Sequence, residues 1–444
     1  MRREGTLLLT GLLSSSMSDL QVPSPSPAER ALLLKFLAKL GLAQLAGGNA
    51  VPLVERDIVL IARQNGLHGI TAFVLPTGLF IKVDDATEHK VDLATGPYRS
   101  GLLRLDQIEE VLVIARDARV GRITPERGLD RLEAMWRSRH RYGKVGFVLG
   151  YLVTTLGVAL MLRPSLVGLG VVALLALLCS GLMLWVRKRP AWAVIMPVVA
   201  SFALSAAVAL SYRFGLKEPA MTLLIPPLIT FLPGMMLTVA VIELAYSNVI
   251  SGASRLVAGF AQLILLAFGI LGGFKAFPFP TSGDAPVPVL ARLGPFMPWL
   301  GVLVFAVGLH VYQSSKPRSF LFMLLTAAVA YGAQTLSGIY IHGASTAFFG
   351  AAAMTIFALV IEFRFNGPPA IVTFIPAFWL LAPGSFGLVS VANLATGTST
   401  AEDILTFLFT LTGIATGCLI GAFVYSGLLH PRSITWWRIE EIAR

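Results

Sequence analysis

The chain has 444 residues, of which 55% are hydrophobic and only 13% are charged, and its formal net charge is +11. Soluble domains carry about 25% charged residues, so the composition excludes an ordinary soluble protein and favours one embedded in a membrane. The positive residues flank apolar segments and form no basic stripe with interleaved aromatics, which argues against a nucleic-acid partner. The two cysteines, Cys179 and Cys418, lie inside apolar segments and indicate no disulfide framework.

The first third of the chain is polar, because 16 of the 24 acidic residues precede Val145. Residues 1–27 are predicted to be a disordered leader and linker. Arg2 and Arg3 precede a short apolar run, as in a weak signal peptide, and either Met1 or Met17 can be the start.

Residues 28–144 are predicted to form a small α+β domain. Ser26, Pro27 and Glu29 form a capped helix start. Helices are expected up to Gly47 and over 52–65, 105–120 and 125–137, with strands over 70–75, 79–83 and 90–93. The segment has no phosphate loop, nucleophile elbow or metal-ligand spacing, so we expect no enzyme activity, cofactor or metal. A set of acidic residues and one histidine is interpreted as solvated: Glu55, Asp57, Asp84, Asp85, Glu88 and His89.

The remainder contains ten apolar segments, each of about the length that a membrane span requires. They are Val145–Leu162, Leu166–Val186, Ala191–Ser211, Met221–Tyr246, Leu256–Phe274, Pro295–Tyr312, Ser319–Ile341, Ala344–Ile361, Ala370–Asn393 and Ile404–Leu429. Residues 145–274 and 295–429 form two five-helix repeats, separated by an external loop at 275–294 and followed by a tail at 430–444. With the first third inside, ten Lys and Arg after Lys144 lie in inner loops and five in outer loops, so both termini are predicted to be cytoplasmic.

The two sets of five spans are related by a repeat. The segment 225–234 aligns without a gap with 375–384, at an offset of 150 residues, and the same register pairs span one with six, two with seven, three with eight and five with ten. Because an odd number of crossings separates equivalent spans, they run in opposite directions. An inverted repeat of this kind is a known transporter architecture.

A Pro-Gly pair, Pro233-Gly234 or Pro383-Gly384, lies near the middle of spans four and nine. Pro removes a backbone hydrogen bond, so each pair predicts a broken helix. Two oppositely directed breaks would offer amides to an anion and carbonyls to a cation, which suits a zwitterion such as a small amino acid. A kink in a packed helix is the alternative for either pair alone, and recurrence in both halves favours the functional break.

Further polar residues in or beside the spans complete the candidate site. Glu243, buried in span four, is the candidate proton carrier, or else a partner of Arg255 at the inner interface. Its equivalent in the second half is Asn393. His310 can transfer protons, or be a satisfied core histidine. The predicted substrate-binding residues are Pro233, Gly234, Pro383, Gly384, Ser385, Asn248, Ser251, Gly252, Arg255 and Asn393.

Several short motifs are distributed along the chain in a fixed order: Gly47-Gly48-Asn49, Val54-Glu55, Ala62 to Leu67, Leu75-Pro76-Thr77-Gly78, Leu232-Pro233-Gly234, Asn248, Ser251-Gly252, Arg255 and Ala382-Pro383-Gly384. Together they resemble the threonine/serine exporter family. The resemblance implies a bacterial inner-membrane protein that exports threonine and serine with the proton gradient, through a cytoplasmic domain fused to ten spans. Two alternatives stay open, an exporter of organic acids such as C4-dicarboxylates and a membrane-anchored ligand sensor. A homo-oligomeric assembly also stays open.

Overall fold

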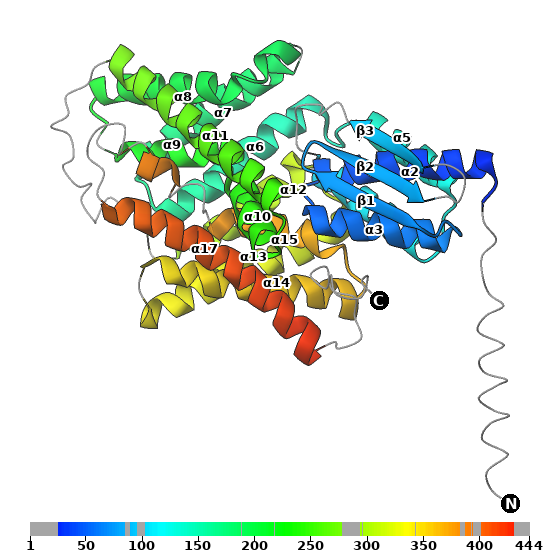
Figure 1. The fold of residues 1–444 in the computed structure, drawn as a ribbon. Coiled ribbons are helices and arrows are strands. Elements are labelled where there is room, and N and C mark those ends of the chain that lie inside the picture. The colour runs from blue at the N-terminus through cyan, green and yellow to red at the C-terminus, as the bar shows by residue number, and fades with distance from the viewer. Residues whose placement is uncertain are drawn as a thin grey trace, which may run out of the picture.

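The computed structural model is mostly helical and has two parts, a small unit with a sheet and a larger bundle of helices (Figure 1). It describes residues 25–84, 89–95, 103–187, 189–216, 218–277, 294, 296–341, 343–381, 387–391, 393 and 401–429. The leader before residue 25, most of the loop at 275–294, and the tail from 430 lie outside these ranges.

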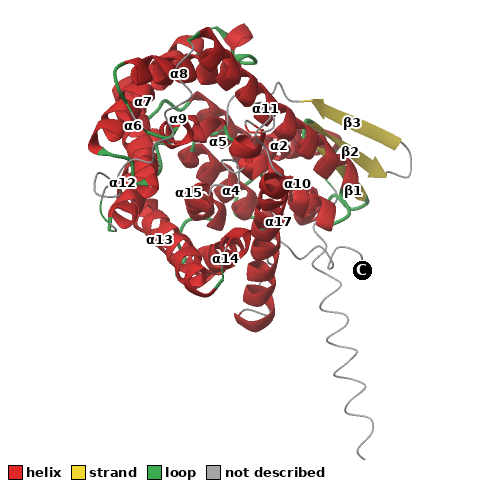
Figure 2. Ribbon diagram, turned by 90° about the vertical axis from the view of Figure 1, so that its left-hand side faces the viewer, coloured by secondary structure: helices red, strands yellow, loops and turns green. Residues whose placement is uncertain are grey.

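The N-terminal unit contains the elements expected from its sequence. Its helices are α2 (Pro27–Ala46), α3 (Val51–Gln64), α4 (Leu105–Arg119) and α5 (Pro125–Arg137), and its strands are β1 (Ile70–Leu75), β2 (Gly78–Asp84) and β3 (His89–Thr95). The strands form one antiparallel sheet in the order β1-β2-β3, and a tight turn joins Leu75 to Gly78. The Ser26 side chain caps α2 as predicted. In Figure 2 the sheet lies at the outer edge of the molecule.

The helical part begins at residue 143. Its main helices are α6 (Gly143–Leu162), α7 (Leu166–Val186), α8 (Met196–Arg213), α9 (Ala220–Leu228), α10 (Gly234–Ala245), α11 (Val249–Ala276), α12 (Met297–Tyr312), α13 (Pro317–Tyr340), α14 (Thr346–Arg364), α15 (Ala370–Leu381) and α17 (Ala401–Val424). Short turns complete it: η1 (Pro190–Trp192), η2 (Ile229–Phe231), η5 (Gly343–Ser345) and η6 (Tyr425–Leu429).

Among the described residues, seven helices are long and apolar enough to cross a membrane, or eight if a bent pair counts as one span. The bent pair is the segment from Ala220 to Phe231 together with α10. Helices α12 and α15 are apolar but shorter. Each of these elements falls on one of the predicted apolar segments.

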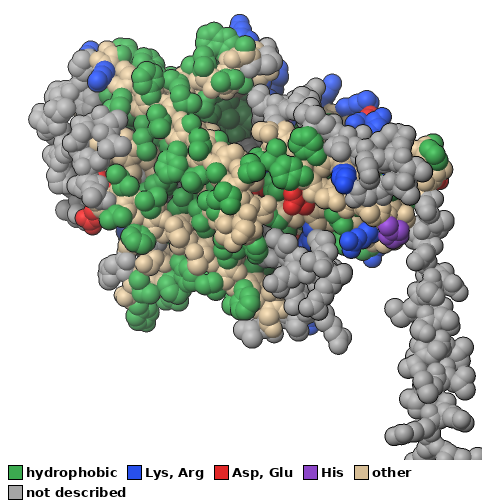
Figure 3. All heavy atoms as spheres, in the orientation of Figure 1, with side chains coloured by type: hydrophobic (Ala, Val, Ile, Leu, Met, Phe, Trp, Pro, Cys, Tyr) green, Lys and Arg blue, Asp and Glu red, His purple; other side chains and the backbone are tan. Residues whose placement is uncertain are grey.

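Apolar side chains cover the outside of the bundle. Leu166 on α7, Phe268 on α11 and Phe423 on α17 are 73%, 67% and 75% exposed. The space-filling view shows hydrophobic side chains over the bundle, whereas Lys and Arg gather over the N-terminal unit (Figure 3). A surface of this kind is stable against lipid and not against water.

Glycines let pairs of helices approach closely. A methyl group on Gly157 of α6 would come within 2.5 Å of Phe305 Cα, and one on Gly308 of α12 within 2.7 Å of Thr154 Cα. Such small residues allow backbone-to-backbone packing where lipid gives no hydrophobic drive for association. Similar contacts join α8 to α11 and α14 to α17.

The N-terminal unit and the bundle share hydrophobic core. Met323 of α13 and Ile371 and Val372 of α15 belong to the same buried cluster as the core of α2 to α5. The two parts are therefore packed together, mainly through α13 and α15.

Candidate substrate and proton site

The fourth apolar segment is broken, as the Pro-Gly pair predicts. Helix α9 ends at Leu228, the single turn η2 follows, and α10 starts at Gly234 at an angle of 61° to the preceding segment. Pro226 and Pro227 inside α9 and Pro233 at the break lack backbone N–H groups, so consecutive helical hydrogen bonds are missing. This part of the prediction is confirmed. Pro383, Gly384 and Ser385 of the second pair lie outside the described residues.

Side chains from other helices bond to the carbonyl groups near the break. Gln262 of α11 donates from Nε2 to the Phe231 carbonyl at 2.5 Å. The buried Tyr151 hydroxyl of α6 donates to the Pro227 carbonyl. An unpaired carbonyl in an apolar interior is destabilising, so these bonds stabilise the bent conformation.

Glu243 lies near the end of α10 and is fully buried. Its Oε2 accepts hydrogen bonds from Ser251 Oγ at 2.6 Å and from Arg255 Nε at 3.1 Å. Its Oε1 accepts from the backbone N–H of Val51 at 2.9 Å. Val51 is the first residue of α3, so one carboxylate links the broken span, α11 and the N-terminal unit. The predicted Arg255 pairing is present, and a role in proton transfer stays a prediction.

The surroundings of this carboxylate hold further charged and polar groups. Arg255 Nη2 also donates to the Asn49 carbonyl at 3.3 Å. Glu55, one turn into α3, accepts from the Val74 N–H at 2.9 Å. Burial raises the pKa of the Glu55 carboxyl, and the negative charge of Glu243 raises it further. The N-terminal unit therefore contributes directly to the site.

The other predicted substrate-binding residues that the structure describes lie next to this cluster in the first half and on separate elements in the second. Asn248 precedes the first residue of α11, and Gly252 packs against α10, where a methyl group would lie 2.8 Å from the Ala240 carbonyl. In the second half, Asn393 donates to Asp403 Oδ2 of α17 at 3.4 Å. Glu243 and Asn393 thus have different partners, although the sequence repeat pairs them.

His310 lies near the end of α12 and is partly buried. Its Nδ1 is hydrogen-bonded to Ser315 Oγ and its Nε2 lies 3.3 Å from the Tyr142 hydroxyl. Both ring nitrogens therefore have a hydroxyl group within hydrogen-bonding distance. This fits the alternative in which His310 is a histidine with its hydrogen bonds satisfied. Its proton-transfer role stays a prediction.

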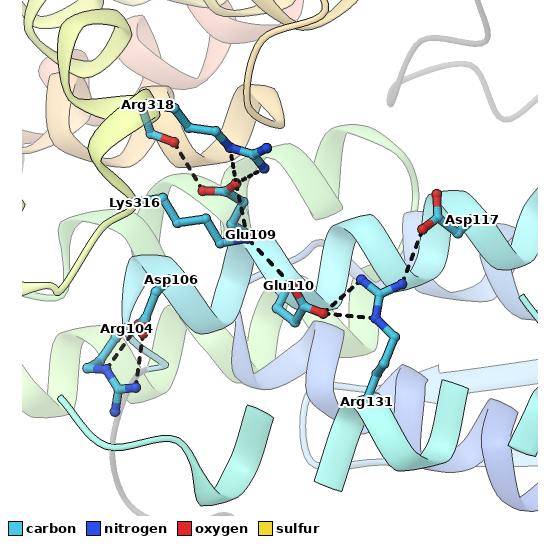
Figure 4. Close-up of polar contacts among 9 residues, drawn as sticks. Arg104, Asp106, Glu109, Glu110, Asp117, Arg131, Lys316 and Arg318 are labelled. Atoms are coloured by element: carbon cyan, nitrogen blue, oxygen red, sulfur yellow. Dashed lines mark hydrogen bonds and ion pairs between the residues drawn. The ribbon is translucent and has the colours of Figure 1, made fainter. Parts of the chain in front are cut away.

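A second polar contact joins the N-terminal unit to the bundle, and no sequence pattern predicted it. Glu109 of α4 is fully buried and accepts from Arg318 Nε at 3.2 Å and from Ser319 Oγ at 3.1 Å, with Lys316 Nζ at 3.3 Å (Figure 4). Lys316 also lies 3.5 Å from Glu110, the next residue of α4. This cluster fixes α4 to the start of α13.

The interpretation of Asp57 as a solvated charge was wrong. Asp57 is 6% exposed, accepts from Gln44 Nε2 at 2.9 Å, and pairs with Arg119 at 3.0 Å. The partners come from α2 and α4, which the local sequence around α3 does not reveal. The side chains at 84, 85, 88 and 89 lie outside those that the structure describes.

Comparison with known proteins places this site within a family. Residues 35–277, slightly more than half of the chain, match the family model described as "Putative threonine/serine exporter" (ThrE). No curated protein and no solved structure matches the chain. The matched region contains most of the N-terminal unit, from within α2 onward, together with the broken span, Glu243 and Arg255. The chain therefore belongs to the threonine/serine exporter family, and is a multi-pass membrane protein of a transporter family rather than one of enzymes.

Proposed function

We propose that the chain is a secondary active exporter of small polar amino acids, threonine and serine, driven by protons. The observation that carries the proposal is the bent fourth span, followed within the same helix by a fully buried carboxylate paired to a guanidinium. Broken spans are found at the substrate sites of transporters, and buried carboxylates in spans commonly carry protons. Family membership supports the substrate class.

The helix contacts support an inverted repeat of two five-helix halves. Gly157 meets Phe305 while Gly308 meets Thr154, so α6 and α12 contact each other through equivalent surfaces and run antiparallel. That is the arrangement expected of the first helices of two oppositely inserted halves.

A second set of contacts supports the same repeat. Gly269 and Gly273 of α11 pack on the backbone of α8 at Val198 and Phe202. In the second half, Gly417 and Gly421 of α17 pack on α14 at Phe348 and Ala352, 150 residues after the contacts on α8. The third and fifth helices of each half therefore pack in the same way.

The proposed topology has the N-terminal domain, residues 28–144, and both chain ends in the cytoplasm of a bacterial cell. Lys and Arg near the inner ends of the spans support this orientation. Alternating access then consists of one half moving against the other around the break at Pro233 and the break predicted from the sequence at Pro383, with substrate bound near Asn248, Ser251 and Arg255. Glu243 takes up and releases the coupled proton.

Counterflow in proteoliposomes tests the proposal. Vesicles loaded with unlabelled threonine should rapidly accumulate labelled threonine, unlabelled serine should compete, and an imposed pH gradient should drive net movement. Glu243→Gln should abolish the pH-driven movement while threonine exchange continues. Absence of threonine counterflow with succinate counterflow present would favour an organic-acid exporter, and absence of both with ligand binding confined to the N-terminal unit would favour a sensor.

A further inference from the structure

The Glu243 carboxylate is held by the set of donors that proteins use to bind a free carboxylate. A backbone N–H at a helix start, a hydroxyl and a guanidinium converge on its two oxygens, from Val51, Ser251 and Arg255. The helix dipole at the Val51 N–H and the positive charge of Arg255 both favour binding of a carboxylate. The Glu243 carboxylate that they bind is fully buried.

The start of α3 depends on a carboxylate from elsewhere in the chain. Its N-cap residue is Ala50, which supplies no capping side chain, whereas Ser26, Thr124 and Ser165 cap α2, α5 and α7. The residue that meets the first amide of α3 is 192 positions away. The N-terminal unit therefore brings an uncapped helix start to the bundle.

The other buried or partly buried glutamates of the described bundle have fewer kinds of hydrogen-bond donor around them. Glu218 accepts from the Ser165 N–H at 2.7 Å, and Glu362 accepts from the Ala370 N–H at 2.8 Å. These are ordinary helix-start contacts. Glu109 is held by cationic and hydroxyl side chains. Among the glutamates whose contacts the structure describes, Glu243 is the one that accepts hydrogen bonds from an amide, a hydroxyl and a guanidinium together.

Acceptors for a cation lie beside these donors. The Asn49 carbonyl accepts from Arg255 Nη2 at 3.3 Å, and Glu55 follows Val51 by one turn of α3 and accepts from the Val74 N–H at 2.9 Å. An amino acid whose carboxylate took the place of the Glu243 carboxylate would bring its ammonium group to this side. The arrangement matches both charges of a zwitterion.

We propose that Glu243 is a tethered occupant of a carboxylate-binding site built by α3 and α11, and that the carboxylate of a small amino acid displaces it. The inference rests on the proposed transport of amino acids. It adds that the N-terminal unit supplies part of the substrate site, through the Val51 N–H, the Asn49 carbonyl and Glu55. When substrate occupies the donors, Glu243 no longer accepts from Val51, Ser251 and Arg255.

Binding to the full-length protein in detergent tests the proposal. Glu243→Gln keeps the shape of the side chain and removes the competing charge. At pH 7.5 this variant should bind labelled threonine at least tenfold more tightly than the natural chain. Propionate, which has the carboxylate alone, should displace threonine from the variant, and threoninol, which lacks the carboxylate, should not. Glu109→Gln is the matched control and should leave threonine affinity unchanged.

The outcomes separate this proposal from the proposed function. Threonine affinity that is unchanged or weaker in Glu243→Gln, or displacement by threoninol as effective as by propionate, would overturn the tethered occupant while leaving threonine counterflow intact as evidence for transport. Propionate binding to the variant, with no threonine counterflow in the natural chain, would keep the site and reject the amino-acid substrate. If Glu243→Gln does not fold, Arg255→Gln gives the second test, because it should weaken threonine binding at least tenfold, and unchanged binding there rejects the site.

Discussion

The break in the fourth span should depend on Gln262. Its Nε2 donates to the Phe231 carbonyl at 2.5 Å, at the end of η2, where the helical hydrogen bonds are interrupted before α10. Gln262→Met keeps the length of the side chain and removes the donor. Leaving this partly buried carbonyl without its partner is destabilising by about 1–3 kcal/mol. A loss of about 1–2 kcal/mol lowers the ratio of folded to unfolded protein by about 5- to 30-fold.

Thermal unfolding of the full chain in detergent measures this effect. Gln334→Met in α13 is the matched control, because the described structure shows no hydrogen bond from the Gln334 side chain. The control should unfold as the natural chain does, and threonine counterflow should fall in Gln262→Met alone. Equal stability of the two variants would refute the argument that Gln262 holds the break.

Three further predictions follow from the packing and charges. Gly273→Ala and Gly421→Ala should destabilise the protein by about 1–3 kcal/mol, because the added methyl would lie 2.5 Å from the Phe202 carbonyl and 2.7 Å from the Ala352 carbonyl. Gly181→Ala, which has open space, should be neutral or stabilising in the same unfolding assay. The raised pKa of Glu55 means that its contribution to stability is lost as pH rises, so Glu55→Gln should unfold at higher temperature than the natural chain at pH 8 and lose this advantage near pH 4. The hydrogen bonds from Ser26 lower the pKa of exposed Glu29, so Glu29→Gln should show the opposite pH dependence, and equal pH profiles would contradict the reasoning. Ala50→Cys should react faster with a membrane-impermeant thiol reagent when it is combined with Glu243→Gln than when it is the single substitution. The reaction of Ser319→Cys should not be accelerated by Glu243→Gln, and equal acceleration at both positions would mean that the whole N-terminal unit detaches.

Local signals predicted the secondary structure well because the residues that set each boundary lie within the element. Ser26 and Glu29 cap α2 through their own side chains, and Gly66 follows the end of α3 with a positive φ of 74°. The same holds for the break, because Pro233 acts on its own backbone. Hydropathy failed at the start of α11, which begins at Val249 rather than Leu256. Its first turns carry Ser251, Ser254 and Arg255, which face a polar environment while the helix continues.

The candidate site could be predicted only in part, because its contacts join distant segments. Arg255 is 12 residues from Glu243, within reach of an argument about neighbouring helix ends. The Val51 N–H is 192 residues away and carries no side-chain signal, since any residue type has that group. Glu109 and Asp57 were missed for the same reason, because their burial depends on how α4 packs against α2, α3 and α13.

The two contacts between the N-terminal unit and the bundle differ in what can change them. The contact with α13 and α15 includes buried Met323, Ile371 and Val372 in one continuous core, and a change in the protonation of Glu243 leaves these apolar side chains in contact. The contact with α10 and α11 depends on the charge of Glu243, which binds the Val51 N–H and Arg255. Neutralising that carboxylate weakens one contact and spares the other. When Glu243 is neutral and no substrate occupies the donors that it leaves, the N-terminal unit should therefore stay with α13 and α15 and separate from α10 and α11, so that an entrance opens between α3 and α11.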